Sequence, residues 1–237
     1  MNIMNIEHIS KIFGEKTIFD DASIGIQEGD KIGIVGINGT GKSTLLRMIA
    51  GDEVPDSGNI IRQNQLKLAW LPQEPKFPEN ATILSYAGDD ETGWKVQSNL
   101  SQLGIMDYSM PIDQLSGGQK RKVALAKVLA QDFDVLLLDE PTVGQDYRGL
   151  QELVEILNRM HRETGNTMIT ITHDMRCAEA LCDHAVLIEK GKVAAEGGKE
   201  LVHRYFFEDV ISDPVGQEDV DAKDPLILRE TASVVNF

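Results

Sequence analysis

The fold of this chain is decided by the stretch Gly36-Ile37-Asn38-Gly39-Thr40-Gly41-Lys42-Ser43, which Thr44 follows. It matches G-x-x-x-x-G-K-[ST], the pattern of a phosphate-binding loop. The apolar run 31–35 before it indicates a short buried strand, and residues 45–50 after it are typical of a helix. Strand, glycine loop and helix in this order turn backbone N–H groups toward a bound anion. The stretch therefore predicts a nucleotide-phosphate site, in which Lys42 reaches the outer phosphates and Ser43 ligates Mg²⁺.

Composition narrows the class of protein. The 237 residues are 41% hydrophobic, which suits one large domain with a subdomain. No apolar run approaches the ~18–20 residues that span a bilayer, and the first residues lack the order of a signal peptide. We therefore expect a cytoplasmic protein. A net charge of −15 argues against a broad basic surface, so we expect no direct DNA binding.

The two cysteines fit a reducing compartment. Cys177 and Cys182 stand five residues apart in a predicted helix. Buried or idle thiols are favoured over a metal pair or a disulfide.

The first third of the chain predicts an N-terminal antiparallel β-subdomain. Residues 3–9 and 22–27 alternate apolar and polar side chains, as half-buried strands do. Phe13 lies on the turn between them, either in the core of a hairpin or as an exposed platform for an adenine ring. Residues 51–58 are rich in Pro and Gly and predict a loop. A strand at about 66–71 then leads to Gln73, held between two prolines, where it faces either a ligand or solvent.

The middle of the chain predicts a short helical subdomain, over about 76–130. Its last part begins with Leu115-Ser116-Gly117-Gly118-Gln119, which opens a strong helix. Ser116 is a natural N-cap, and the glycines leave N–H donors bare as a second anion site. Basic side chains at 120–122 oppose the helix dipole, a penalty that is tolerable if an anion docks there.

Two strand ends supply the remaining chemistry. The apolar run 135–138 is typical of a buried parallel strand and delivers Asp139 and Glu140 at its carboxyl end, where such sheets bind ligands. Asp139 is placed to bind Mg²⁺, and Glu140 to accept a proton from water. After an amphipathic helix at 148–163, the strand 167–172 ends at His173, a candidate phosphate contact.

The end of the chain is acidic. A helix at 174–182 and a hairpin over 185–195 complete the predicted α/β core, and we expect a single domain at 1–205. The acidic tail 206–237 is either solvated and flexible or an interaction segment.

Together these elements resemble the ATP-binding cassette (ABC) ATPases over residues 3–200. The string at 115–119, twenty residues ahead of the strand that starts at Val135, is that family's distinguishing signature. The resemblance implies a P-loop NTPase fold with ATP and Mg²⁺ as cofactors. It assigns adenine stacking to Phe13, sensing of Mg²⁺ and the γ-phosphate to Gln73, and the Mg²⁺ carboxylate to Asp139. It makes Glu140 the general base, His173 the switch histidine, and Asp146 the residue that communicates across the dimer.

The resemblance also implies partners. In this family one ATP is held between the P-loop of one cassette and the signature of another, so the site needs a second cassette, identical or different. Residues 1–142, with Val35–Gly39 and Trp70–Glu74, are similar to the first cassette of ABC-F proteins, which act on ribosomes. Val143-Gly144-Gln145-Asp146 and residues 172–197 are similar to importer ATPases of the energy-coupling-factor type. A membrane transporter subunit at the inner face of the membrane is the leading partner, the ribosome the alternative, and a patchwork or trimmed cassette a further hypothesis.

Overall fold

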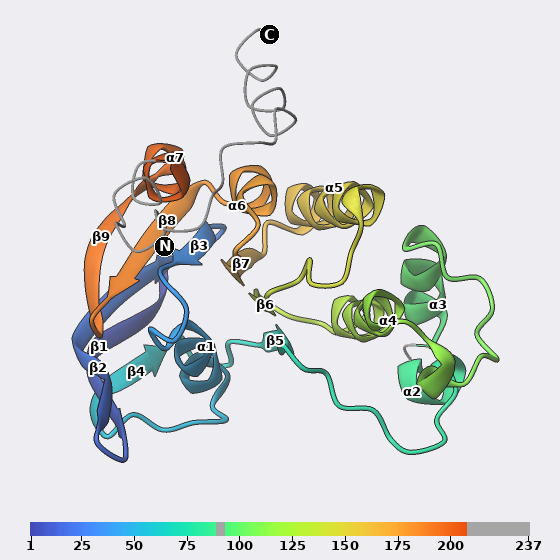
Figure 1. The fold of residues 1–237 in the computed structure, drawn as a ribbon, viewed down its shortest axis with the longest axis horizontal. Helices are drawn as coiled ribbons and strands as arrows, with labels where there is room; N and C mark the ends of the chain where they lie inside the picture. Colours follow the sequence, from blue (N-terminus) through green and yellow to red (C-terminus); the bar gives the residue numbers. More distant parts are fainter. Residues whose placement is uncertain (89–92, 208–237) are drawn as a thin grey trace, which may run out of the picture.

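The protein is built on two sheets in the computed structural model, which describes residues 1–88 and 93–207 (Figure 1). The larger sheet has six strands in the order β5-β6-β7-β3-β8-β9, all parallel except β9, which pairs antiparallel with β8. Its strands are β3 (Lys31–Val35), β5 (Leu68–Leu71), β6 (Val135–Asp139), β7 (Thr167–Ile171), β8 (His184–Glu189) and β9 (Lys192–Gly198). Strand β6 is buried at every residue, as its apolar run predicted, and β7, predicted only as a strand, is buried throughout as well.

The smaller sheet is antiparallel and has the order β2-β1-β4. It comprises β1 (Asn2–Phe13), β2 (Lys16–Gln27) and β4 (Ser57–Arg62). The hairpin β1–β2 confirms the antiparallel pair predicted from alternation. The predicted loop 51–58 is wrong at its end, because Ser57 and Gly58 begin β4. Gly58 has φ +80°, and a Cβ there would lie 2.3 Å from the carbonyl oxygen of His8. Gly58 is therefore needed where two strands approach closely, although its presence in the sequence suggested a loop.

Helices cover both faces of the six-stranded sheet (Figure 1). On one side lies α1 (Lys42–Ala50), whose Leu45, Leu46 and Ile49 share a core with both sheets. On the other side lie α5 (Tyr147–Thr164), α6 (Met175–Leu181) and α7 (Lys199–Phe207). Sequence patterns missed α7, whose Leu201 and Val202 are buried against α6 and β8. The apolar residues of 199–207 have no strong helical period, so packing against α6 and β8 makes this segment a helix.

A helical group lies at one end of the molecule (Figure 1). It contains α2 (Ile83–Ala87), α3 (Gly93–Gln102), the 3₁₀ turn η1 (Ile112–Gln114) and α4 (Gly117–Leu129). These helices share one apolar core with β5, β6 and α5. The limits 1–205 and 76–130 stay predictions, and the acidic tail lies outside the described residues except for its first two positions.

Both cysteines are buried and free, as predicted. Burial raises the pKa of the Cys177 and Cys182 thiols to about 12. Over residues 1–88 and 93–207, no helix is both long and apolar enough to cross a membrane.

Candidate functional site

The glycine loop between β3 and α1 takes the shape that its sequence predicts. Gly36 and Gly41 have φ +149° and +95°, conformations that L side chains rarely adopt. A Cβ on Gly41 would also lie 2.3 Å from Cγ2 of Ile18, so the loop has room only for glycine there. Thr40 Oγ1 donates to the carbonyl of Ile37 at 2.9 Å and closes the turn.

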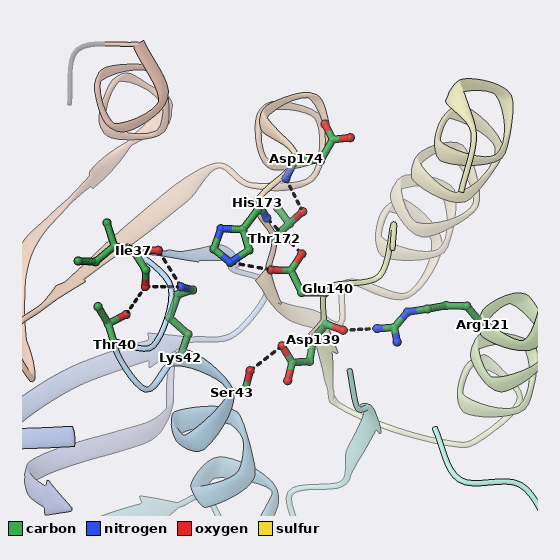
Figure 2. A network of polar contacts seen from close by, with 11 residues as sticks. Ile37, Thr40, Lys42, Ser43, Arg121, Asp139, Glu140, Thr172, His173 and Asp174 are labelled. Atoms are coloured by element: carbon green, nitrogen blue, oxygen red, sulfur yellow. Dashed lines mark hydrogen bonds and ion pairs between the residues drawn. The ribbon is translucent and has the colours of Figure 1, made fainter. Parts of the chain in front are cut away.

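Lys42 is 6% exposed and curls back over this loop. Its Nζ donates to the carbonyls of Gly36 at 2.7 Å and Ile37 at 2.9 Å (Figure 2). Burial lowers the pKa of the ammonium, and the carboxylates of Glu140 and Asp139 oppose that shift. A buried cation beside bare loop amides is suited to bind a phosphate.

Ser43 and Asp139 form the oxygen pair expected of a Mg²⁺ site. Ser43 Oγ donates to Asp139 Oδ1 at 3.1 Å. Burial raises the pKa of Asp139, while the Ser43 hydrogen bond opposes the shift. Hard oxygen donors of this kind fit Mg²⁺, which usually takes one or two carboxylates and completes its shell from phosphates and water. The described residues hold no group of three or more His, Cys, Asp or Glu that could ligate a metal.

Glu140 and His173 meet at the ends of β6 and β7 (Figure 2). Glu140 has φ +52°, a left-handed conformation that turns its side chain out of the strand direction. Its Oε2 accepts the backbone N–H of His173 at 3.2 Å, and Oε1 lies 3.2 Å from His173 Nε2 without hydrogen-bond geometry. Burial raises the pKa of Glu140 and lowers the pKa of His173, which favours a neutral imidazole beside the glutamate.

One cavity of about 260 Å³ gathers most of these groups. Its lining confirms that the glycine loop, Gln73, Glu140 and His173 come together, and it adds Ile18 and Ile171. The full lining is Ile18, Asn38, Gly39, Gly41, Lys42, Ser43, Thr44, Gln73, Glu140, Ile171 and His173. A second cavity of about 510 Å³ shares Glu140 and His173 and continues beside Thr142 and Val143.

The signature segment is placed apart from this lining. Ser116 caps α4: its Oγ accepts the N–H of Gln119 at 3.2 Å, and Gln119 Oε1 accepts the N–H of Ser116 at 2.9 Å. Gly117 and Gly118 follow in the first turn of α4. Gln145, which sequence reasoning missed, donates from Nε2 to the Gly118 carbonyl at 2.8 Å and ties the loop after β6 to this helix start.

Phe13 and Asp146 are also outside the cavity lining. Phe13 is 42% exposed, so the alternative that places it in a hairpin core is wrong and the platform alternative stands. Across the turn, Lys16 Nζ donates to the carbonyl of Gly39 at 3.2 Å, which brings the tip of the hairpin to the glycine loop. Asp146 caps α5, with Oδ1 accepting the N–H of Gly149 at 2.8 Å.

Arg121 is the functional candidate that sequence reasoning placed wrongly. The sequence predicts basic side chains at 120–122 near a docked anion, yet Arg121 is 4% exposed and points into the protein. Its guanidinium donates to the carbonyls of Pro72, Gln73 and Asp139. Arg121 lies three positions after Gly118 and four before Leu125, and both of these residues are buried. Helical spacing therefore places Arg121 on the buried face of α4 and could have predicted its burial.

Comparisons with known proteins agree with this geometry. Residues 19–143 match the family described as ABC transporter. The chain is 31% identical over 222 residues to the iron(3+)-hydroxamate import ATP-binding protein FhuC of Bacillus subtilis, covering 83% of this chain and 82% of that protein. It is 30% identical over 240 residues to the spermidine/putrescine import ATP-binding protein PotA of Bacteroides thetaiotaomicron, covering 92% of this chain and 51% of that one. The chain thus spans about half the length of the first curated relatives it matches.

Solved structures share the fold. The chain superposes on MJ1267, an ATP-binding cassette of an ABC transporter, with a TM-score of 0.76 at 24% identity, covering 89% of this chain and 97% of that one. It superposes on cbiO1 of Clostridium perfringens, part of the transporter complex cbiONQ, with a TM-score of 0.70 at 28% identity, covering 86% and 92%. These matches confirm the predicted α/β P-loop fold.

Proposed function

Because this chain belongs to the ABC transporter family, we propose that it is the ATP-binding and ATP-hydrolysing subunit of a transporter, working as a head-to-tail pair of cassettes. The observation that carries the proposal is the convergence of Lys42, Glu140 and His173 on one cavity at the carboxyl edge of the parallel sheet. Its relatives include import ATP-binding proteins named for different cargoes, so the proposal concerns the ATPase step they share.

Binding is assigned to the glycine loop and its neighbours. The ammonium of Lys42 exchanges its two carbonyl partners for phosphate oxygens, and the loop amides of 38–44 hold the remaining charge. Ser43, Asp139 and Gln73 would hold Mg²⁺, which when bound neutralises charge that develops on the phosphates. Phe13 at the exposed hairpin end offers an apolar face to the adenine ring.

Hydrolysis is assigned to Glu140. Its carboxylate accepts a proton from the attacking water, and its raised pKa makes it a stronger base than an ordinary glutamate. The backbone N–H of His173 holds one oxygen of that carboxylate, and its neutral imidazole would offer a donor toward the γ-phosphate. The reaction converts ATP and water to ADP and phosphate, an in-line displacement at phosphorus.

The second cassette is proposed because the cavity beside Lys42 takes no lining residue from Ser116–Gln119. A partner copy turned head to tail would bring its own bare helix start to the phosphates. Ile37 of the glycine loop and Val143, which lines the second cavity, are exposed and would be covered by such a partner. A related cassette, MJ0796, has been solved as a dimer bound to ADP and Pi.

The test is a purification from the native host with ATP turnover measured on the pure chain. We expect Mg²⁺-dependent phosphate release and co-purification with a membrane protein, which places the chain at the inner face of the membrane. Pelleting with ribosomes instead would favour the ABC-F-like alternative that residues 1–142 suggest. No Mg²⁺-dependent turnover in either preparation would contradict the ATPase proposal.

A further inference from the structure

Arg121 joins three parts of the molecule that sequence order keeps apart. It projects from α4, and Nη1 donates to Pro72 O at 3.1 Å and to Gln73 O, on the segment after β5. Nη2 donates to Asp139 O at the end of β6 (Figure 2). These acceptors are backbone carbonyls beside Gln73 and Glu140, so Arg121 acts on the peptide planes that carry those two side chains.

The Asp139 carbonyl needs this donor. The ladder between β5 and β6 ends at the pair Leu71–Leu138, one residue before Asp139. Glu140 then turns into the left-handed region at φ +52°, a conformation that is strained for any residue other than glycine. Such a conformation persists only where neighbours hold it. The peptide between Asp139 and Glu140 is held at both ends. Arg121 donates to its carbonyl oxygen, and its N–H, that of Glu140, donates to Ile171 O at 2.9 Å.

The guanidinium is committed to this task. Arg121 is buried, and its Nε has no hydrogen-bond acceptor among the described residues. No described carboxylate lies within ion-pair distance of the guanidinium, and the hydrogen bonds of its two terminal nitrogens all go to backbone carbonyls. A planar fork can reach two chain segments at once, whereas an ammonium on a flexible stem cannot fix both in the same way.

We infer that Arg121 is a positioning residue for hydrolysis, which aims Gln73 and Glu140 into the nucleotide cavity by clamping the two peptides that carry them. The inference rests on the proposed ATPase function and adds a residue that touches no substrate. Lys42 and the glycine loop are held by their own contacts, so the phosphate contacts of that loop do not depend on the clamp.

The experiment compares R121M, which keeps the apolar stem, with R121K, which keeps one cation, in the full chain. The matched control is K127M on the same helix, where Nζ donates to Tyr86 O at 2.8 Å, away from the cavity. For each protein we measure kcat and KM for ATP, thermal unfolding, and amide exchange of segments 71–75 and 139–143 without nucleotide.

We expect R121M to lower kcat about 10- to 100-fold, the range typical of residues that orient a reacting group, with KM for ATP within about twofold of wild type. Amides of both segments should exchange faster in nucleotide-free R121M, R121K should be intermediate in rate and exchange, and K127M should match wild type in both.

Wild-type kcat and exchange in R121M, a rise in KM with unchanged kcat, or an equal loss in K127M would overturn the inference. Should R121M not fold, R121K decides: slowed turnover with faster exchange supports the clamp, and wild-type behaviour overturns it. If the wild-type chain hydrolyses no ATP, the proposed function fails, whereas the exchange difference still tests the clamp.

Discussion

Glu140 accepts one hydrogen bond from His173 and lies against its ring: Oε2 accepts the His173 backbone N–H at 3.2 Å, and Oε1 lies 3.2 Å from His173 Nε2 without hydrogen-bond geometry. The two residues are 33 positions apart and meet because β6 and β7 are parallel neighbours in register. The pair orients the carboxylate while one face of it lines the cavity beside Lys42. The proposal that Glu140 is the general base requires a carboxylate that is buried and held in one direction, and the burial of Glu140 and its bond from the His173 N–H support that proposal.

Replacing Glu140 by Gln should stop turnover and keep binding. The amide retains the size of the side chain and an acceptor for the His173 N–H but cannot take a proton from water. We expect phosphate release to fall by about 10²- to 10⁴-fold, with ATP affinity unchanged and an ATP-bound dimer that accumulates in size-exclusion chromatography. Glu189→Gln, at the exposed end of β8, is the control. A wild-type rate in E140Q would show that another group is the base.

Lys42→Ala should weaken ATP binding. The substitution removes a charge-assisted donor worth about 1.5–3 kcal/mol, which corresponds to roughly 10- to 150-fold in Kd. Calorimetric titration of ATP measures the change. Lys192→Ala, an exposed lysine on β9, controls for lost positive charge. An unchanged Kd in K42A would be incompatible with the role given to the glycine loop.

The difference in stability between E140Q and the wild type should depend on pH in a defined direction. Burial raises the folded-state pKa of Glu140 above its unfolded value, with Asp139 adding to the shift and Lys42 and Arg121 opposing it. The group therefore stabilises the fold fully only below its unfolded pKa, and that stability is lost as pH rises through its folded pKa. Asp139 is present in both proteins, so its own titration largely cancels in the difference between their free energies of unfolding.

We consequently expect E140Q to unfold at a higher urea concentration than wild type at pH 7, with the difference shrinking as pH falls toward about 4. Urea melts at several pH values on nucleotide-free protein provide the measurement. A lower midpoint for E140Q at pH 7, or a difference that does not vary with pH, would mean that burial does not strain this carboxylate.

Phe13→Ala should reduce the affinity for ATP and ADP alike. Loss of one aromatic–base stack costs about 1–3 kcal/mol, or roughly 5- to 150-fold in Kd. Phe13→Tyr should restore binding, since the ring face is kept. The neighbouring Ile12→Ala, also exposed, should have little effect. Equal affinities for F13A and wild type would leave the hairpin end without a role in base recognition.

Local sequence was enough for the parts whose chemistry is contained in a few adjacent residues. The glycine loop needs positive φ at Gly36 and Gly41, and only glycine adopts it freely, so the pattern and the conformation coincide. The Ser116–Gln119 capping box and the fully apolar β6 follow for the same reason, since hydrogen bonds within four residues or burial on both faces specify them.

Contacts between distant segments required the three-dimensional structure. β4 forms because β1 offers it a ladder, and α7 because α6 and β8 offer it an apolar face; neither has a strong pattern of its own. Arg121 shows the same limit at the site. A basic residue in the first turns of a helix predicts an exposed partner for an anion, yet its acceptors are carbonyls 49, 48 and 18 residues away. Such long-range pairs are set by packing of the whole core, which a short stretch of sequence does not encode.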